Sequence, residues 1–186
     1  NCSAFAARVT ASSLSDVYSA IVSAISALKG PLHGGANEQV MLMLKKIGNY
    51  ENCVKWIKEA LANKEKVMGF GHRVYKNGDP RAKILRQMSE QITKKTGEEH
   101  WYKMSALIDD TVQAEKGLLP NVDFYSATVY YSMGIPIDLY TPIFAVSRVS
   151  GWLAHIFEQW TNNRIYRPRG KWNGKEGLVW TPPSKR

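Results

Sequence analysis

Residues 14–30, LSDVYSAIVSAISALKG, decide the fold class, because their apolar side chains recur every three or four positions. This spacing places them on one face of a helix, whereas a strand would show alternation. The apolar stripe consists of Leu14, Val17, Tyr18, Ile21, Ile25 and Leu28. Ser15 or Asp16 can cap the start and Gly30 the end. We therefore predict an amphipathic helix here.

The same helical period continues along the chain. We predict further helices at 36–48, 52–64, 81–95, 100–117, 122–134 and 140–160. The Asp79-Pro80 pair marks a helix start, since Asp suits the N-cap and Pro suits the first helical position. An alternating pattern is sustained nowhere, and charged residues flank the one Asn-Gly pair, Asn77-Gly78. The sequence therefore predicts an all-α protein with an extended tail from Arg164.

Composition and charge narrow the class of protein. The chain has 186 residues, of which 44% are hydrophobic, and this suits one large domain or two small ones. It contains no run of about 18 apolar residues, so we expect no membrane span, and its first residues do not resemble a signal peptide. Cys2 and Cys53 lack the spacing of a metal site or disulfide framework. We therefore expect a cytoplasmic protein with no metal.

The net charge of +9 is compatible with nucleic acid, membranes or acidic small molecules as partners. The Lys and Arg residues are scattered, with one denser segment, NRIYRPRGKW, at 163–172. A helical nucleic-acid-binding module would concentrate them on one helix face. That alternative is therefore disfavoured, and we expect neither nucleic acid nor membrane as a partner.

Two of the four histidines stand apart from the predicted helices. His100 and His155 fall inside helical patterns, but His33 and His72 stand in glycine-rich breaks ahead of helices, GPLHGGAN (30–37) and GFGHRVYK (69–76). Glycine lets backbone approach a ligand closely, and the free N–H groups at a helix start lower the pKa of a nearby histidine. Such a pair can donate hydrogen bonds to developing oxyanions. Two glycine-bounded turns are the simpler alternative.

A carboxylate and an arginine complete the candidate set. Asp123 begins a helix that is otherwise apolar and aromatic, so it is either an N-cap or a desolvated general base, and Asn121 is available for the cap. Arg148 interrupts an apolar run, where an unpaired guanidinium would be costly. Either a bound carboxylate or an acidic side chain of the protein can pair with it. These residue types suit proton abstraction next to a carbonyl on an acidic substrate.

Four motifs resemble, in order and spacing, those of the citrate synthase family. They are GPLHGGANE (30–38), GFGHRVYKNGDPRA (69–82), PNVDFYSA (120–127) and FAVSRVSGWLAH (144–155) followed by RPR (167–169). The resemblance covers essentially the whole chain and implies a multi-helical fold. It also implies an acyltransferase of the tricarboxylic acid cycle, which condenses acetyl-CoA with oxaloacetate and then hydrolyses citryl-CoA.

The resemblance implies a role for each matching residue. Asp123 corresponds to the base that removes a methyl proton from acetyl-CoA, His33 to the donor toward the thioester oxygen, and His72 to the group that polarises the oxaloacetate carbonyl. The implied carboxylate clamps are Arg81, Arg148 and Arg167, the last reaching the neighbouring subunit's site in a homodimer. The implied coenzyme A contacts are Val67, Gly69, Gly71, Lys76, Lys116 and Asn121. Coenzyme A enters as a thioester substrate, so no cofactor is implied.

The family's chain is longer than this one. The resemblance implies large-domain segments at 1–34 and 135–186 around a small helical domain at 35–134, and it implies that a preceding half is absent. We therefore expect this chain to be inactive alone or to associate with that half. Within the family, a 2-methylcitrate synthase using propionyl-CoA is the alternative, since one methylene is worth only about 1–3 kcal/mol in a pocket. The motifs at 69–82 and 120–127 favour citrate synthase.

Overall fold

The computed structural model describes residues 1–185 and is helical, with no β-strand in that range beyond an isolated bridge between Phe70 and Pro120. The predicted all-α class is confirmed. The helices are α1 Cys2–Ser12, α2 Val17–Leu28, α3 Ala36–Ile47, α4 Cys53–Ala62, α5 Pro80–Thr96, α6 Glu99–Lys116, α7 Val122–Ser132 and α8 Tyr140–Thr161. Short 3-10 turns lie at Tyr50–Asn52, Ile137–Leu139 and Pro183–Lys185.

All seven predicted helical regions correspond to helices, α2 through α8, but α1 was not predicted. The buried face of α1 is made of Ser3, Ala4, Ala7, Ala11 and Ser12. These side chains are small, so they leave no stripe of large apolar residues for a periodicity argument to find. The helix owes its place to close packing against α2 and α8, which is a tertiary effect.

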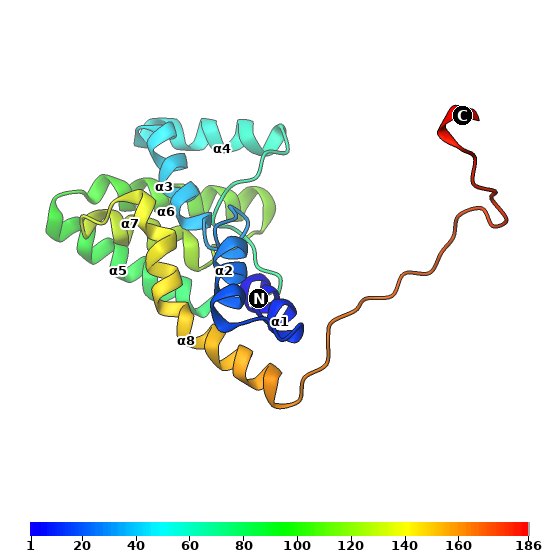
Figure 1. Cartoon of the computed structure of the whole chain (residues 1–186). Coiled ribbons are helices and arrows are strands. Elements are labelled where there is room, and N and C mark those ends of the chain that lie inside the picture. The colour runs from blue at the N-terminus through cyan, green and yellow to red at the C-terminus, as the bar shows by residue number, and fades with distance from the viewer. Residues whose placement is uncertain (186) are drawn as a thin grey trace.

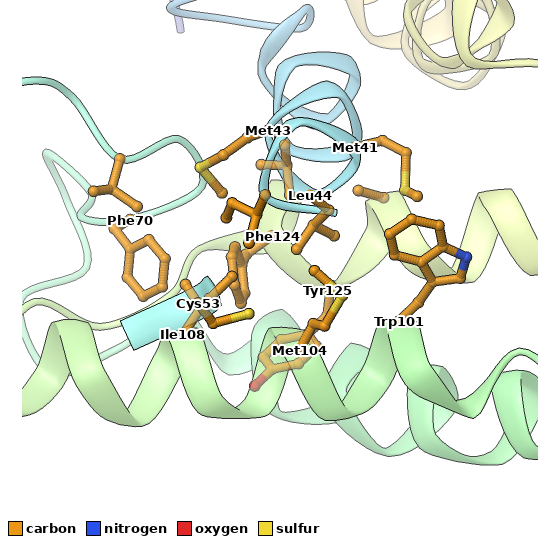
Figure 2. Packing of buried hydrophobic residues seen from close by; sticks show 14 of the residues in the cluster. Met41, Met43, Leu44, Cys53, Phe70, Trp101, Met104, Ile108, Phe124 and Tyr125 are labelled. Carbon is orange, nitrogen blue, oxygen red and sulfur yellow. The ribbon is translucent and has the colours of Figure 1, made fainter. Parts of the chain in front are cut away.

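A first hydrophobic cluster fills the space between α3, α4, α6 and α7. In Figure 2, Leu44 of α3, Ile108 of α6 and Phe124 of α7 point toward one another. Ile57 of α4 joins them, and all four side chains are fully buried. Burying a side chain of this size stabilises a fold by about 1.5–3 kcal/mol. This core fixes the helix starts that face the candidate site.

A second cluster joins α1 and α2 to α8. Alanines at positions 7, 11, 20 and 24 let the first two helices approach closely, and the fully buried Trp152 of α8 packs against them. In Figure 1 these three helices lie together, while α3 to α7 form the other group. Helix α8 contributes to both clusters, Tyr140 to the first and Trp152 to the second. The predicted domain boundaries at 34/35 and 134/135 stay a prediction, because the shared helix marks no sharp border.

The predicted tail leaves the body after α8. Its start is held on α1 and α8, since Tyr166 N donates to Ser12 Oγ (3.1 Å) and its hydroxyl donates to Gln159 Oε1 (3.0 Å). The rest runs outward in Figure 1 with Trp172, Leu178, Val179 and Trp180 exposed. None of the helices in residues 1–185 combines the length and the apolar character that crossing a membrane requires.

Candidate active site

Five of the six predicted catalytic and carboxylate-binding residues line one cavity of about 310 Å³. They are His33, His72, Arg81, Asp123 and Arg148. The other lining residues are Asn1, Val74, Tyr75, Asn121, Val122 and Phe144. They come from the start of α1, the loops before α3 and α5, the first turns of α5 and α7, and the middle of α8. This volume is at the small end of ligand pockets, which span about 300–1,000 Å³.

His33 is held as a neutral imidazole with one free N–H. The backbone N–H of Ser3 points at His33 Nε2 (3.3 Å), and Ser3 Oγ lies 2.9 Å from the same nitrogen. Because an amide N–H can only donate, Nε2 is the acceptor and the ring proton belongs on Nδ1. Burial first, and then the positive charge of Arg148, lowers the pKa of His33 below its ordinary value. The imidazole is therefore an uncharged donor at neutral pH.

The glycines beside His33 have a packing role. A Cβ on Gly34 would overlap the Cδ1 atom of Leu28, and one on Gly35 would lie 2.8 Å from the Lys29 carbonyl oxygen. Neither glycine has a positive φ. The loop therefore needs glycine because it packs tightly on the end of α2, and this packing places His33 at the cavity wall.

His72 has the opposite tautomer. Its Nδ1 accepts from the backbone N–H groups of Val74 (3.0 Å) and Tyr75 (3.1 Å), so the proton belongs on Nε2. These N–H groups belong to a turn well ahead of α5, so His72 does not stand at a helix start as expected, whereas the predicted start of α5 at Asp79-Pro80 is confirmed. The ring of Tyr75 stacks on His72 with 4.6 Å between centroids. The turn and the stack together fix the direction of the Nε2–H donor.

Asp123 is in the first turn of α7 and has a raised pKa. The N-cap is Asn121, whose Oδ1 accepts from Asp123 N (3.0 Å), as predicted, so the Asp123 carboxylate is free of that task. Burial raises its pKa from 3.8 to about 6, with Arg81 acting to lower it and Asp79 to raise it. A carboxylate with a pKa near neutrality is suited to general base catalysis.

The two arginines of the cavity differ in their partners. Arg148 has a buried Nη1 with no hydrogen-bond partner, and its guanidinium lies 4.9 Å from the ring of Phe144. Among residues 1–185 no acidic side chain forms an ion pair with it, so its guanidinium is available to a bound anion. Arg81 pairs with Asp79 (2.7 Å) but keeps an exposed face toward the cavity. The cavity therefore offers two cationic groups to an acidic ligand.

Among the remaining predicted residues, Asn121 also lines the cavity and the others do not. Arg167 is exposed on the tail beyond α8 and contributes nothing to this chain's cavity wall. The loops at 67–71 and 117–121 pair through Gly71 N to Leu119 O (2.9 Å) and Asn121 N to Gly69 O (2.8 Å).

The glycines of the first loop are required for two reasons. Gly69 has φ 84°, and a Cβ there would lie 2.8 Å from Cβ of Phe124, whereas Gly71 has φ 76° and open space around it. Lys76 lines a smaller cavity of about 170 Å³ beside this pair, while Val67 is buried in the first cluster. Lys116 ends α6 next to the second loop.

Comparison with known proteins identifies the family. The family model described as citrate synthase, C-terminal domain, matches residues 1–169. The chain belongs to the citrate synthase family. Citrate synthase 2 of Bacillus subtilis is 60% identical over all of this chain and 50% of its own length, and 2-methylcitrate synthase 1 of Corynebacterium glutamicum is 46% identical over all of this chain and 49% of its own.

A solved structure agrees with this assignment. The citrate synthase of Thermoplasma acidophilum, in a ternary complex with carboxymethyl coenzyme A and oxaloacetate, superposes with a TM-score of 0.90. It is 39% identical, and the match covers 100% of this chain and 51% of that one. The chain therefore spans about half the length of the citrate synthase relatives it matches.

The structure places further residues at the site that the sequence motifs of the citrate synthase family did not identify as functional. Ser3 holds His33, and Tyr75 stacks on His72 while the Arg81 guanidinium lies 5.7 Å from its ring. Asp79 was predicted only as a helix cap. Nothing in the sequence indicated the role of Ser3, because its contact with His33 spans 30 positions along the chain. Tyr75 lies within the motif at 69–82, but it is uncharged and was therefore not identified as a site residue.

Proposed function

We propose that this chain provides the catalytic cavity of a citrate synthase, which condenses acetyl-CoA with oxaloacetate and hydrolyses the resulting citryl-CoA. The observation that carries the proposal is the convergence of a raised-pKa carboxylate, two oriented imidazole donors and two arginines on one cavity of about 310 Å³. The relatives named citrate synthase support it. The 2-methylcitrate synthase alternative has the lower identity of the two relatives compared.

The first chemical step removes a proton from the methyl group of acetyl-CoA. The ordinary pKa of that methyl group lies far above that of any carboxylate, so Asp123 can accept the proton only if the enol is stabilised as it forms. The Nδ1–H of His33 donates to the thioester oxygen, where the negative charge develops. Donors fixed in advance, in a site with little water, are worth several kcal/mol in such a step.

The second step joins the enol carbon to the carbonyl carbon of oxaloacetate. Arg81 and Arg148 bind the substrate carboxylates, and the Nε2–H of His72 polarises the carbonyl that is attacked. A new carbon–carbon bond forms as the carbon–oxygen π bond breaks, and the carbonyl oxygen takes up a proton, balancing the one that Asp123 removed, to become the hydroxyl of citryl-CoA. Fixing the two reactants side by side removes much of the entropy cost of their encounter. Water then cleaves the thioester and releases citrate and the coenzyme A thiol.

The experiment uses a completed enzyme, defined as this chain joined at residue 1 to the remaining half of Bacillus subtilis citrate synthase 2. With acetyl-CoA and oxaloacetate we expect citrate and free coenzyme A, and kcat/KM for propionyl-CoA lower by about 10-fold or more. We expect the 186-residue chain alone to show no turnover. Product formation that depends on neither the thioester nor oxaloacetate would refute the proposal. A higher kcat/KM for propionyl-CoA than for acetyl-CoA would favour 2-methylcitrate synthase.

A homodimer in the cytoplasm is part of the proposal, with Arg167 completing the partner's site. Its support is the exposed position of Arg167 and the exposed apolar side chains Phe5, Tyr18 and Val22 on α1 and α2. Arg167→Ala and Asp123→Asn should each be nearly inactive as pure homodimers. In a re-associated equal mixture, about half of the dimers carry one intact site, so about a quarter of wild-type activity should return. Mixed dimers that form but stay inactive would show that Arg167 does not act across the interface.

A further inference from the structure

The Asp79 carboxylate connects two catalytic helix starts. Its side chain is 0% exposed. Oδ1 accepts from the backbone N–H of Arg81 (3.0 Å) and from its Nε (2.9 Å), while Oδ2 accepts from Arg81 Nη2 (2.7 Å) and from the backbone N–H of Val122 (3.1 Å). A helix cap requires only the first of these bonds. The other three need a separate explanation.

The bond to Val122 fixes the backbone of the proposed base. Val122 is 43 positions from Asp79 and directly precedes Asp123. The N–H of Asp123 is itself bound by Asn121 Oδ1 (3.0 Å). Two successive N–H groups in the first turn of α7 are therefore held by side chains, one from α7's own cap and one from the cap of α5. The Asp123 carboxylate therefore projects from a backbone segment that has little freedom to shift.

The two bonds from the Arg81 side chain orient its guanidinium. Asp79 binds the Nε and Nη2 edge in the bidentate geometry that fixes a guanidinium plane. Arg81 also lines the cavity, and its guanidinium keeps N–H groups that Asp79 does not bind. Hydrogen bonding to Asp79 raises the pKa of Arg81, so its charge is permanent. Burial acts to raise the pKa of Asp79, but the bonds and charge of Arg81 and the Val122 bond outweigh it, and the pKa of Asp79 lies below its ordinary value.

We propose that Asp79 is a positioning residue for two groups at once, fixing Asp123 through the Val122 amide and aiming Arg81 at a substrate carboxylate. This inference rests on the proposed function. The charge of Asp79 has a further effect, because a second carboxylate nearby makes Asp123 a stronger base. The other titratable or charged groups around Asp123 are Arg81, His33, His72, Arg148 and Tyr75, which line the cavity with it, and Tyr130, which interacts electrostatically with it. Of these, Arg81 acts against Asp79.

The test compares neutral variants of Asp79 with a matched cap elsewhere. Asp79→Asn and Asp79→Ser keep a capping oxygen but lose the charge. Asp16, the N-cap of α2, accepts from Ser19 N (2.9 Å) and is remote from the cavity lining, so Asp16→Asn is the control. In the completed enzyme we expect about a 10-fold loss of kcat and about a 10-fold rise in the KM for oxaloacetate for both Asp79 variants. Asp16→Asn should change neither constant.

A second readout does not depend on catalysis. Carboxyl carbon NMR follows the titration of Asp123, whose signal is assigned by its loss in Asp123→Asn. We expect the midpoint to move to lower pH in both Asp79 variants and to stay unchanged in Asp16→Asn. Unchanged kinetic constants and an unchanged midpoint would reduce Asp79 to a helix cap and overturn the inference. A moved midpoint in an enzyme that forms no citrate would instead refute the proposed function and leave the coupling between the two residues standing.

Discussion

Replacing Asp123 by Asn in the completed enzyme should lower kcat on the order of 10³-fold, because no other carboxylate of the cavity is free to take the methyl proton. Asp79 is the nearest candidate, but all of its oxygens are occupied by Arg81 and Val122. The KM for oxaloacetate should change little, since Arg81 and Arg148 remain. Steady-state kinetics with acetyl-CoA check this expectation. A kcat within a few-fold of wild type would exclude Asp123 as the base.

The same variant should be more stable than the wild type at neutral pH. The pKa of Asp123 is about 6 in the fold against an ordinary value of 3.8. The folded state therefore holds its proton more tightly, and the stability that this provides is full below about pH 4 and is lost as the pH rises through about 6. A shift of this size corresponds to about 3 kcal/mol. In urea unfolding, the free energy of unfolding of the variant should exceed that of the wild type by up to that amount at pH 7 and should equal it at low pH. An equal gain at both pH values would contradict the linkage.

The second large effect is expected at His33. His33→Ala removes the donor to the thioester oxygen, and the loss of one such donor lowers kcat by about 10²–10³-fold. His33→Asn should recover part of this loss, because its amide N–H can occupy the place of Nδ1–H. An Asn variant no better than Ala would mean that the imidazole acts by some other route than donation.

Ser3→Ala is the matched control for His33. It keeps the backbone N–H that sets the tautomer but removes the Oγ that accepts from Trp152 Nε1 (3.1 Å). We expect a loss of stability of about 1–3 kcal/mol, from the unpartnered indole N–H, with kcat within about 10-fold of wild type. A kcat loss as large as that of His33→Ala would show that the hydroxyl, and not the amide, sets the state of His33.

Sequence patterns predicted helices α2 to α8 and most of the cavity residues. The stripe in α2 and the Asp79-Pro80 start depend on neighbouring positions, so they can be read locally. The histidines and Asp123 stood out because glycine and apolar neighbours are unusual settings for them. Helix α1 escaped because alanine packing leaves no periodic signal, and the reason for Gly34 required knowing that Leu28 lies beneath it.

The long-range contacts of the site were beyond sequence reasoning. The tautomer of His33 depends on Ser3, and the second role of Asp79 depends on Val122, which is 43 positions away. These distances along the chain carry no periodic pattern. Only the packing of α1 and α8 around one loop, and of α5 against α7, brings the partners together.

We propose that the desolvated Asp123 carboxylate is the base of an enolisation site. The pH dependence of kcat/KM for acetyl-CoA in the completed enzyme tests it most directly. We expect an acid limb with its midpoint near 6, where Asp123 takes up its proton. A rate that stays constant well below that pH would contradict the claim.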